Sequence, residues 1–153
     1  MILDTRLMFV DKTSVVGAVG TNLLGNVIDT GIAHRDLGSG QDLFFFVEVV
    51  TSIIAAAGAG TVSFQLITSA SSTMSSPVVI AGLITQPIGV TATGLVVAGA
   101  QFHLAPLPQE GVTYLEYLGV QAVITGNPIT SGAISCGLTL DRHGWQSYPR
   151  NYA

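Results

Sequence analysis

Few residues of this chain carry groups that do chemistry, and their spacing matches no catalytic pattern. The nearest match is the segment at residues 34–37, which has the first four letters of the protein-kinase catalytic loop. In that loop the aspartate accepts a proton, and an asparagine five positions later binds magnesium. Asp36 would be the aspartate here, but Gln41 stands where the asparagine belongs. We therefore interpret the segment as a loop that contains a charge pair.

The other reactive side chains are equally isolated. Ser135 lies in a glycine-containing segment, but a nucleophile elbow needs glycine two residues before and two residues after its serine. The histidines lack the short paired spacing that puts two imidazoles on one metal ion, and nothing around the glutamates favours a glycosidase pair. The sequence thus predicts no enzyme, no cofactor and no metal site. The histidines and glutamates concerned are His34, His103, His143, Glu48, Glu110 and Glu116.

Composition narrows the classes of function further. Only 9% of the 153 residues are charged, where about a quarter is usual, and the net charge is −4. Without a basic cluster the chain lacks the electrostatic surface that nucleic-acid binding needs. The single Cys136 cannot form an intrachain disulfide, so it is expected to fill core.

The absence of charge is concentrated in the middle of the chain. Residues 49–109 contain no Asp, Glu, Lys or Arg. Either serine and threonine solvate this block, or it packs against other chains. Prolines, glutamines and many hydroxyl residues interrupt its apolar stretches, so we expect no membrane span. Asp4 and Arg6 likewise break the apolar start of the chain, and no secretory signal is expected.

The pattern of apolar residues predicts an all-β fold. Apolar and polar residues alternate at 62–67, 101–104 and 133–140, the period of a half-buried strand. Segments 43–47 and 114–120 are apolar on both faces and suit strands covered on each side. Further strands are expected at 14–18, 26–30, 77–84 and 95–98. About eight or nine strands with long connections fit a jelly roll or a related two-sheet β-sandwich.

No linker or repeat divides the chain, so residues 1–153 are expected to form one domain, with an amino-terminal arm at 1–12 and a carboxyl tail at 143–153. The arm is apolar and either binds a partner or forms the first strand of its own sheet. The tail contains Trp, Tyr and Arg, the residue types that contribute most to binding energy at interfaces. It either binds a partner or folds back over the sandwich. The candidate partner-binding residues are Ile2, Leu3, Leu7, Met8, Phe9, Trp145, Tyr148, Arg150 and Tyr152.

Several short segments, in order along nearly the whole chain, carry a resemblance to a known family. They are Met1-Ile2-Leu3-Asp4 with Leu7 and Phe9, Asn26-Val27-Ile28-Asp29, Asp36-Leu37-Gly38-Ser39-Gly40, Phe64-Gln65, Thr68-Ser69, Ser75-Ser76-Pro77, Gly99-Ala100-Gln101-Phe102-His103-Leu104 with Pro108, Tyr114-Leu115 with Tyr117, Ser131-Gly132-Ala133-Ile134, Gly137-Leu138 and Tyr148-Pro149. In this collinear pattern the chain resembles the capsid cement (decoration) proteins of short-tailed bacteriophages.

The resemblance implies a jelly-roll domain that forms a small homo-oligomer, a dimer or trimer. It also implies a virion protein, made in the host cytoplasm, that sits on the outside of an icosahedral shell. There it would bridge neighbouring capsomers of the major capsid protein. The rival from another class is a carbohydrate-binding jelly roll, such as a lectin-like or fibre-head module, in which aromatic side chains stack on sugar.

Overall fold

The computed structural model of the chain describes residues 5–31, 43–81, 85–107 and 112–140. Within these ranges the regular structure is almost entirely β, with two single-turn 3-10 helices. The elements are η1 (Thr5–Leu7), β1 (Met8–Ser14), β2 (Gly20–Asp29), β3 (Phe44–Ala55), β4 (Gly60–Ser69), β5 (Val78–Val79), β6 (Gln86–Ile88), η2 (Gly94–Val96), β7 (Gln101–Pro106), β8 (Tyr117–Thr125) and β9 (Ile129–Thr139).

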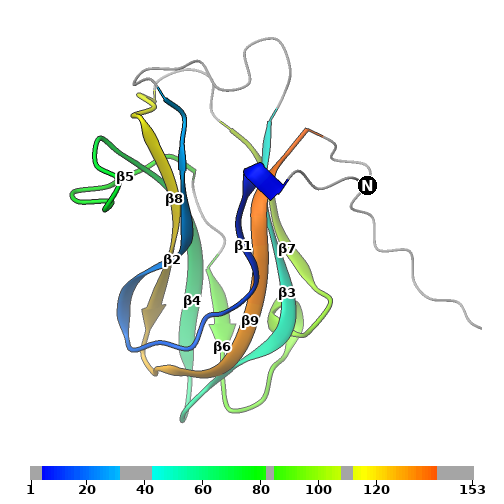
Figure 1. Cartoon of the computed structure of the whole chain (residues 1–153). Coiled ribbons are helices and arrows are strands. Elements are labelled where there is room, and N and C mark those ends of the chain that lie inside the picture. Colours follow the sequence, from blue (N-terminus) through cyan, green and yellow to red (C-terminus); the bar gives the residue numbers. More distant parts are fainter. Residues whose placement is uncertain (1–4, 32–42, 82–84, 108–111, 141–153) are drawn as a thin grey trace, which may run out of the picture.

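The strands form two sheets that pack face to face (Figure 1). The first sheet has the order β1-β9-β3-β7, and the second has β2-β8-β4-β5, with β6 also pairing with β4. The antiparallel pairs are nested: β1 with β9, β2 with β8, β3 with β7, and β4 with β5 and β6. This nesting is that of one long hairpin rolled into two sheets, which is the jelly roll. The expected fold class is therefore confirmed.

Alternation along the strands supplies the core between the sheets. In β4, Phe64 and Leu66 point inward, and in β9 Ile134 and Cys136 do the same. Phe9 of β1 meets Phe45 of β3 edge to face, with ring centroids 6.4 Å apart. Such a pair contributes about 1 kcal/mol beyond the area that it buries. The cysteine fills core, as its sequence setting predicted.

The amino-terminal arm expected at residues 1–12 is shorter than predicted, because Met8–Ser14 is strand β1 of the domain's own sheet. Phe9 is 0% exposed, so no partner can reach it in the folded chain. Deleting residues 1–9 would remove a core side chain rather than a free arm. The alternative that the arm begins the domain's own sheet is therefore correct from Met8 onward.

Three expected strands differ from the structure. Residues 15–18 form the turn between β1 and β2, where only Gly17 makes an isolated bridge to Ile129. Residues 94–96 form helix η2, whose first residue, Gly94, has a left-handed φ of +66°. Within 77–84, only Val78 and Val79 are described as a strand. In each case an apolar run has the composition of a strand, but a glycine turn or a lack of pairing partners prevents an extended ladder.

Candidate interaction surface

One end of the sandwich is built from four loops that contain no charged residue. They are the β1–β2 loop (15–19), the β3–β4 loop (56–59), the β6–β7 loop (89–100) and the β8–β9 loop (126–128), and the structure describes all four. Their polar side chains are those of Thr91, Thr93 and Asn127, and every other residue is Gly, Ala, Val, Leu or Pro. We call these four loops the apolar end; it lies at the bottom of Figure 1.

Backbone hydrogen bonds hold these loops together. Gly17 and Ile129 exchange two N–H···O bonds, of 3.2 and 3.0 Å. Ala56 N–H donates to the Pro128 carbonyl at 2.9 Å, and Ala55 N–H donates to the Gly89 carbonyl at 2.8 Å. The Asn127 side-chain amide donates to the Ala59 carbonyl at 3.0 Å. Because loop groups satisfy one another, the end keeps its shape without charged side chains.

The apolar end exposes large hydrophobic side chains to water. Val90 is 61% exposed and Val16 is 55% exposed, and Val19 is comparable. Leu95 and Val97 add to this surface where the β6–β7 loop runs beside β3, to which it is tied by the bond from Ala98 N–H to Ser52 Oγ. Five of the nine large hydrophobics exposed in the described chain thus belong to two of these loops. Exposed apolar side chains in two loops at one end of the domain make this end a candidate interaction surface.

A shallow groove of about 360 Å³ lies between two of these loops. The β3–β4 loop lines one side with Gly58 and Ala59, and strand β6 with the start of the β6–β7 loop lines the other. Backbone, aliphatic side chains and two threonine hydroxyls face the groove, and no titratable group does. Such a surface can bury aliphatic side chains of a partner, but it has no group that could act as an acid, base or nucleophile.

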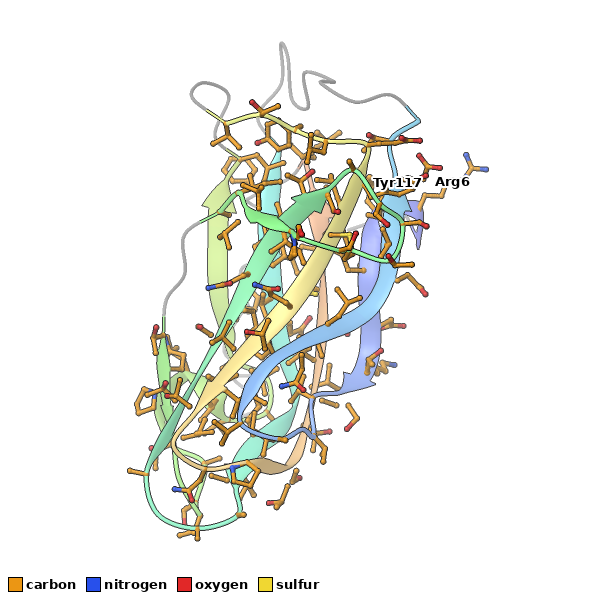
Figure 2. All side chains as sticks on the ribbon, turned by 90° about the vertical axis from the view of Figure 1, so that its left-hand side faces the viewer. Arg6 and Tyr117 are labelled. Atoms are coloured by element: carbon orange, nitrogen blue, oxygen red, sulfur yellow. The ribbon has the colours of Figure 1, made fainter. Side chains whose placement is uncertain are left out.

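No described charge lies within the four loops of the apolar end. Asp29 lies opposite Tyr117 in the pairing of β2 with β8, next to Glu116, toward the other end of the sandwich, and Figure 2 shows Arg6 and Tyr117 both toward this end. The Glu116 carboxylate raises the pKa of the Tyr117 phenol above its usual value, and partial burial and Asp29 add to the effect. Three of the six described charges, Arg6, Asp29 and Glu116, thus lie toward the end opposite the apolar end.

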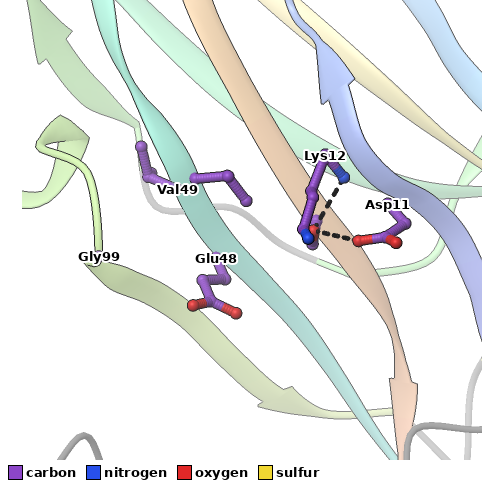
Figure 3. A pocket seen from close by; sticks show the side chains of 7 residues that line it. Asp11, Lys12, Glu48, Val49 and Gly99 are labelled. Atoms are coloured by element: carbon purple, nitrogen blue, oxygen red, sulfur yellow. Dashed lines mark hydrogen bonds between the residues drawn. The ribbon is translucent and has the colours of Figure 1, made fainter.

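A second groove, of about 450 Å³, lies on the first sheet and contains the remaining described charges, Asp11, Lys12 and Glu48 (Figure 3). The Ser135 hydroxyl donates to Asp11 Oδ1 at 2.9 Å and accepts from the Lys12 backbone N–H at 3.0 Å. These bonds hold a bulge of β1 in which Lys12 has φ +49°. Ser135 and Asp11 thus stabilise the backbone of the bulge in β1, and they are not placed as a nucleophile and its base.

The remaining candidates for chemistry in the described chain are the Cys136 thiol and the side chains that could bind a metal ion. Burial raises the pKa of the Cys136 thiol far above its usual value, so the thiol stays protonated and unreactive. No three His, Cys, Asp or Glu side chains gather closely enough to bind a metal ion within the ranges given above. Among the same residues, no helix has the length and apolarity needed to cross a membrane.

The structure separates the predicted partner-binding residues into two groups. Leu7 and Met8 are half-buried beside the core, and Phe9 is inside it. The other predicted residues, Ile2, Leu3, Trp145, Tyr148, Arg150 and Tyr152, lie outside the described residues, and their role stays a prediction.

The apolar end was missed as a site because its loops come from four distant parts of the chain. The charge-free block at 49–109 signalled two of the loops, but those at 15–19 and 126–128 fall outside that block.

Comparison with known proteins identifies a family. A model of the Bbp16 family matches residues 12–138, which is most of the chain and nearly all of the sandwich. The chain belongs to the Bbp16 family. The match begins within β1 and ends within β9, so it covers both sheets and the apolar end. No curated protein matches the sequence of this Bbp16-family chain.

Proposed function

We propose that this Bbp16-family protein is a capsid cement protein: a structural virion component that binds the outside of an icosahedral phage shell and joins neighbouring capsomers of the major capsid protein. It acts without catalysis, as a homo-oligomer made in the host cytoplasm. The observation that carries the proposal is the apolar end, whose four loops are free of charge and expose Val16, Val19 and Val90.

The physics of cementing favours such a surface. Burying exposed aliphatic groups yields about 25 cal/mol per Å², whereas each buried unpaired charge costs several kcal/mol. Valine and alanine also lose less side-chain entropy on docking than lysine or glutamate. Attachment through several copies of a modest interface multiplies the affinity by effective concentration. A rigid, uncharged end repeated in each copy of an oligomer meets these requirements.

The carbohydrate-binding alternative receives less support from the same end. Sugar recognition combines aromatic faces, which stack on the ring, with polar side chains that bind the hydroxyl groups. The four loops contain no aromatic residue, and the groove between the β3–β4 loop and the β6–β7 loop offers two threonine hydroxyls as its side-chain hydrogen-bonding groups.

Co-sedimentation with empty shells, assembled from the major capsid protein encoded in the same genome, tests the proposal. The double variant Val16→Lys/Val90→Lys places charge on the apolar end at two exposed positions, so the fold is preserved. We expect it to reduce the bound fraction at least about tenfold, because two charges would have to be desolvated at the junction. The matched control is Val78→Lys/Val79→Lys, which adds the same charge at exposed valines of β5.

Loss of binding in the first variant with normal binding of the control supports the proposal. Equal binding of wild type and both variants would rule out the apolar end as the attachment site. A wild-type chain that fails to sediment with the shells would remove the cement function altogether. Binding of the wild type to a glycan array, with no shell binding, would favour the carbohydrate-binding alternative.

A further inference from the structure

A sandwich of two sheets has four edges, and three of those in this structure are protected against pairing with another strand. The bulge at Asp11 and Lys12 breaks the edge of β1 and places two charges there. Strand β7 ends in Pro106, which has no N–H to donate. The edge formed by β5 and β6 has strands of two and three residues, with Pro87 at the centre of β6. Bulges, charges, prolines and short strands are the usual devices against edge-to-edge association.

The fourth edge, that of β2, has none of these devices along its first half. From Gly20 to Leu24 the strand pairs with β8 residue by residue without a register shift, and no described strand pairs with its other side. The stretch contains no proline and no charged residue. Its outward backbone N–H and C=O groups therefore line an open edge of about 17 Å, the length of five extended residues.

The open stretch begins at the apolar end. The β1–β2 loop, which exposes Val16 and Val19, leads directly into Gly20. The Asn22 side-chain amide donates to the Ala18 carbonyl at 3.0 Å, which holds this loop against the start of the strand. The exposed valines and the open edge thus lie on one continuous segment of the chain.

Strand β1 limits the open stretch at its far end. Gly25 has φ +61°, and a side chain there would run into Val10 and the Phe9 carbonyl oxygen. Because β1 approaches so closely, an added strand has room only beside the residues before Gly25.

The side chains of Thr21 and Leu23 lie on the outer face of this edge. Thr21 pairs with Val123 of β8 and Leu23 pairs with Gln121, so the two side chains share one face of the second sheet. Leu23 is 48% exposed although it is a large apolar side chain. A strand added at the edge places every second side chain beside these two, and an apolar residue there would bury Leu23.

We propose that the edge of β2 from Gly20 to Leu24 receives an extended, uncharged segment of the major capsid protein as an added strand. This inference rests on the proposed function and names the chemistry of one of its contacts. Main-chain hydrogen bonds from the added strand satisfy the open N–H and C=O groups, and alternate apolar side chains cover Leu23. Because the edge begins at the apolar end, a segment that rises from the shell reaches it without leaving the proposed attachment surface.

The direction of β2 favours the shell protein over a second copy of this chain. A two-fold contact would pair the two β2 edges antiparallel. The apolar end of the second copy would then lie at the far end of the pair, away from a shell that the first copy touches. A segment of the shell protein meets no such conflict. The edge is also free of charge, so an uncharged segment leaves no buried charge unpaired.

Hydrogen exchange of the protein bound to empty shells tests the pairing without a variant. Between Gly20 and Leu24, every second amide faces away from β8. We expect these amides to exchange at least about tenfold more slowly in the sedimented complex than in the free chain. The amides of Val78 and Val79 in β5, at the opposite edge of the same sheet, are the internal control and should not change. Mass spectrometry with fragmentation reads the exchange residue by residue.

A charged variant of the edge gives a second measurement. Thr21→Lys/Leu23→Lys changes two exposed side chains and leaves the backbone pairing with β8 in place. We expect it to weaken shell binding at least about tenfold in co-sedimentation, because two charges would have to be desolvated against the added strand. Val78→Lys/Val79→Lys, at exposed valines of β5, is the matched control and should bind like the wild type.

Three results would overturn the proposal, and they differ in what else they remove. If the wild type sediments with shells while its amides at 20–24 exchange as in the free chain, the edge is not a contact and the cement function stands. If these amides become protected as the concentration of the free protein rises, a second copy occupies the edge. If the wild type does not sediment with shells, the cement function fails and this inference fails with it.

Discussion

At the scale of single residues, Phe9 shows how a core residue can be mistaken for a partner-binding residue. Its neighbours Leu7 and Met8 are apolar and stand near the start of the chain, a pattern that fits a docking arm and a first strand equally well. The contact that separates these alternatives is with Phe45, and it forms only when β1 is laid beside β9, more than a hundred residues away. The pattern of residues close in sequence to Phe9 carries no information about its contact with Phe45.

We expect Phe9→Ala to lower the free energy of unfolding by about 3 to 5 kcal/mol, because it leaves a cavity at a fully buried site. Chemical denaturation followed by fluorescence or circular dichroism measures the change. Val16→Ala is the control, since Val16 is exposed in a loop and should change stability by less than about 0.5 kcal/mol. A loss below 1 kcal/mol for Phe9→Ala, on the order of a surface substitution, would contradict its place in the core.

Gly25 is a second residue whose importance depends on tertiary structure. Its positive φ favours glycine, and its Cα faces the backbone of β1. Gly31 also has positive φ, but a Cβ there would meet nothing within 4 Å. Gly31→Ala should therefore cost about 1 kcal/mol from backbone strain alone. Gly25→Ala should cost at least about 2 kcal/mol more in the same denaturation experiment, because β1 must move. Equal costs would show that β1 does not approach β2 closely.

At the scale of elements, the sequence predicted strands best where both alternation and a pairing partner are present. Strands β4, β7 and β9 were predicted from alternation, and each pairs over most of its length. The apolar run at 95–98 failed because composition alone does not reveal that Gly94 turns the chain into η2. The order of strands was not predictable, since nested pairing depends on contacts between the two ends of the chain.

Strand β1 gives a prediction at this scale. A chain that begins at Val15 lacks Phe9 and Val10 and exposes the edge of β9, so we expect it to lose cooperative thermal unfolding. A chain that ends at Leu140 keeps all nine strands, and its Tm should stay within about 3 °C of the wild type. A larger fall in Tm for the second truncation would favour the alternative in which the carboxyl tail packs over the sandwich. Cooperative unfolding of the first would contradict the structural role of β1.

At the scale of the whole molecule, the apolar end holds five of the nine large hydrophobic residues that the described chain exposes, and none of the described charges lies in its loops. Arg6, Asp29 and Glu116 lie toward one end of the sandwich, with Asp29 opposite Tyr117 in the second sheet, and the apolar end lies at the other. The low fraction of charged residues predicted a surface with little charge. It did not predict that the four charge-free loops would lie at one end, because they come together only when the two sheets form. A molecule with this polarity can bind a surface through one end while its other end stays hydrated.

This polarity predicts how attachment to shells depends on salt. Contacts between aliphatic groups involve no ion pairs, so raising NaCl from about 0.05 to 1 M, which shortens the Debye length from roughly 14 to 3 Å, should not release the protein. We expect the bound fraction in co-sedimentation to change less than about twofold, and to rise if it changes at all, since salts that are excluded from apolar surface strengthen burial. Attachment through Arg6, Asp29 and Glu116 would instead fall steeply over this range. A steep loss of binding would therefore assign attachment to the charged end and reverse the proposed orientation of the molecule on the shell.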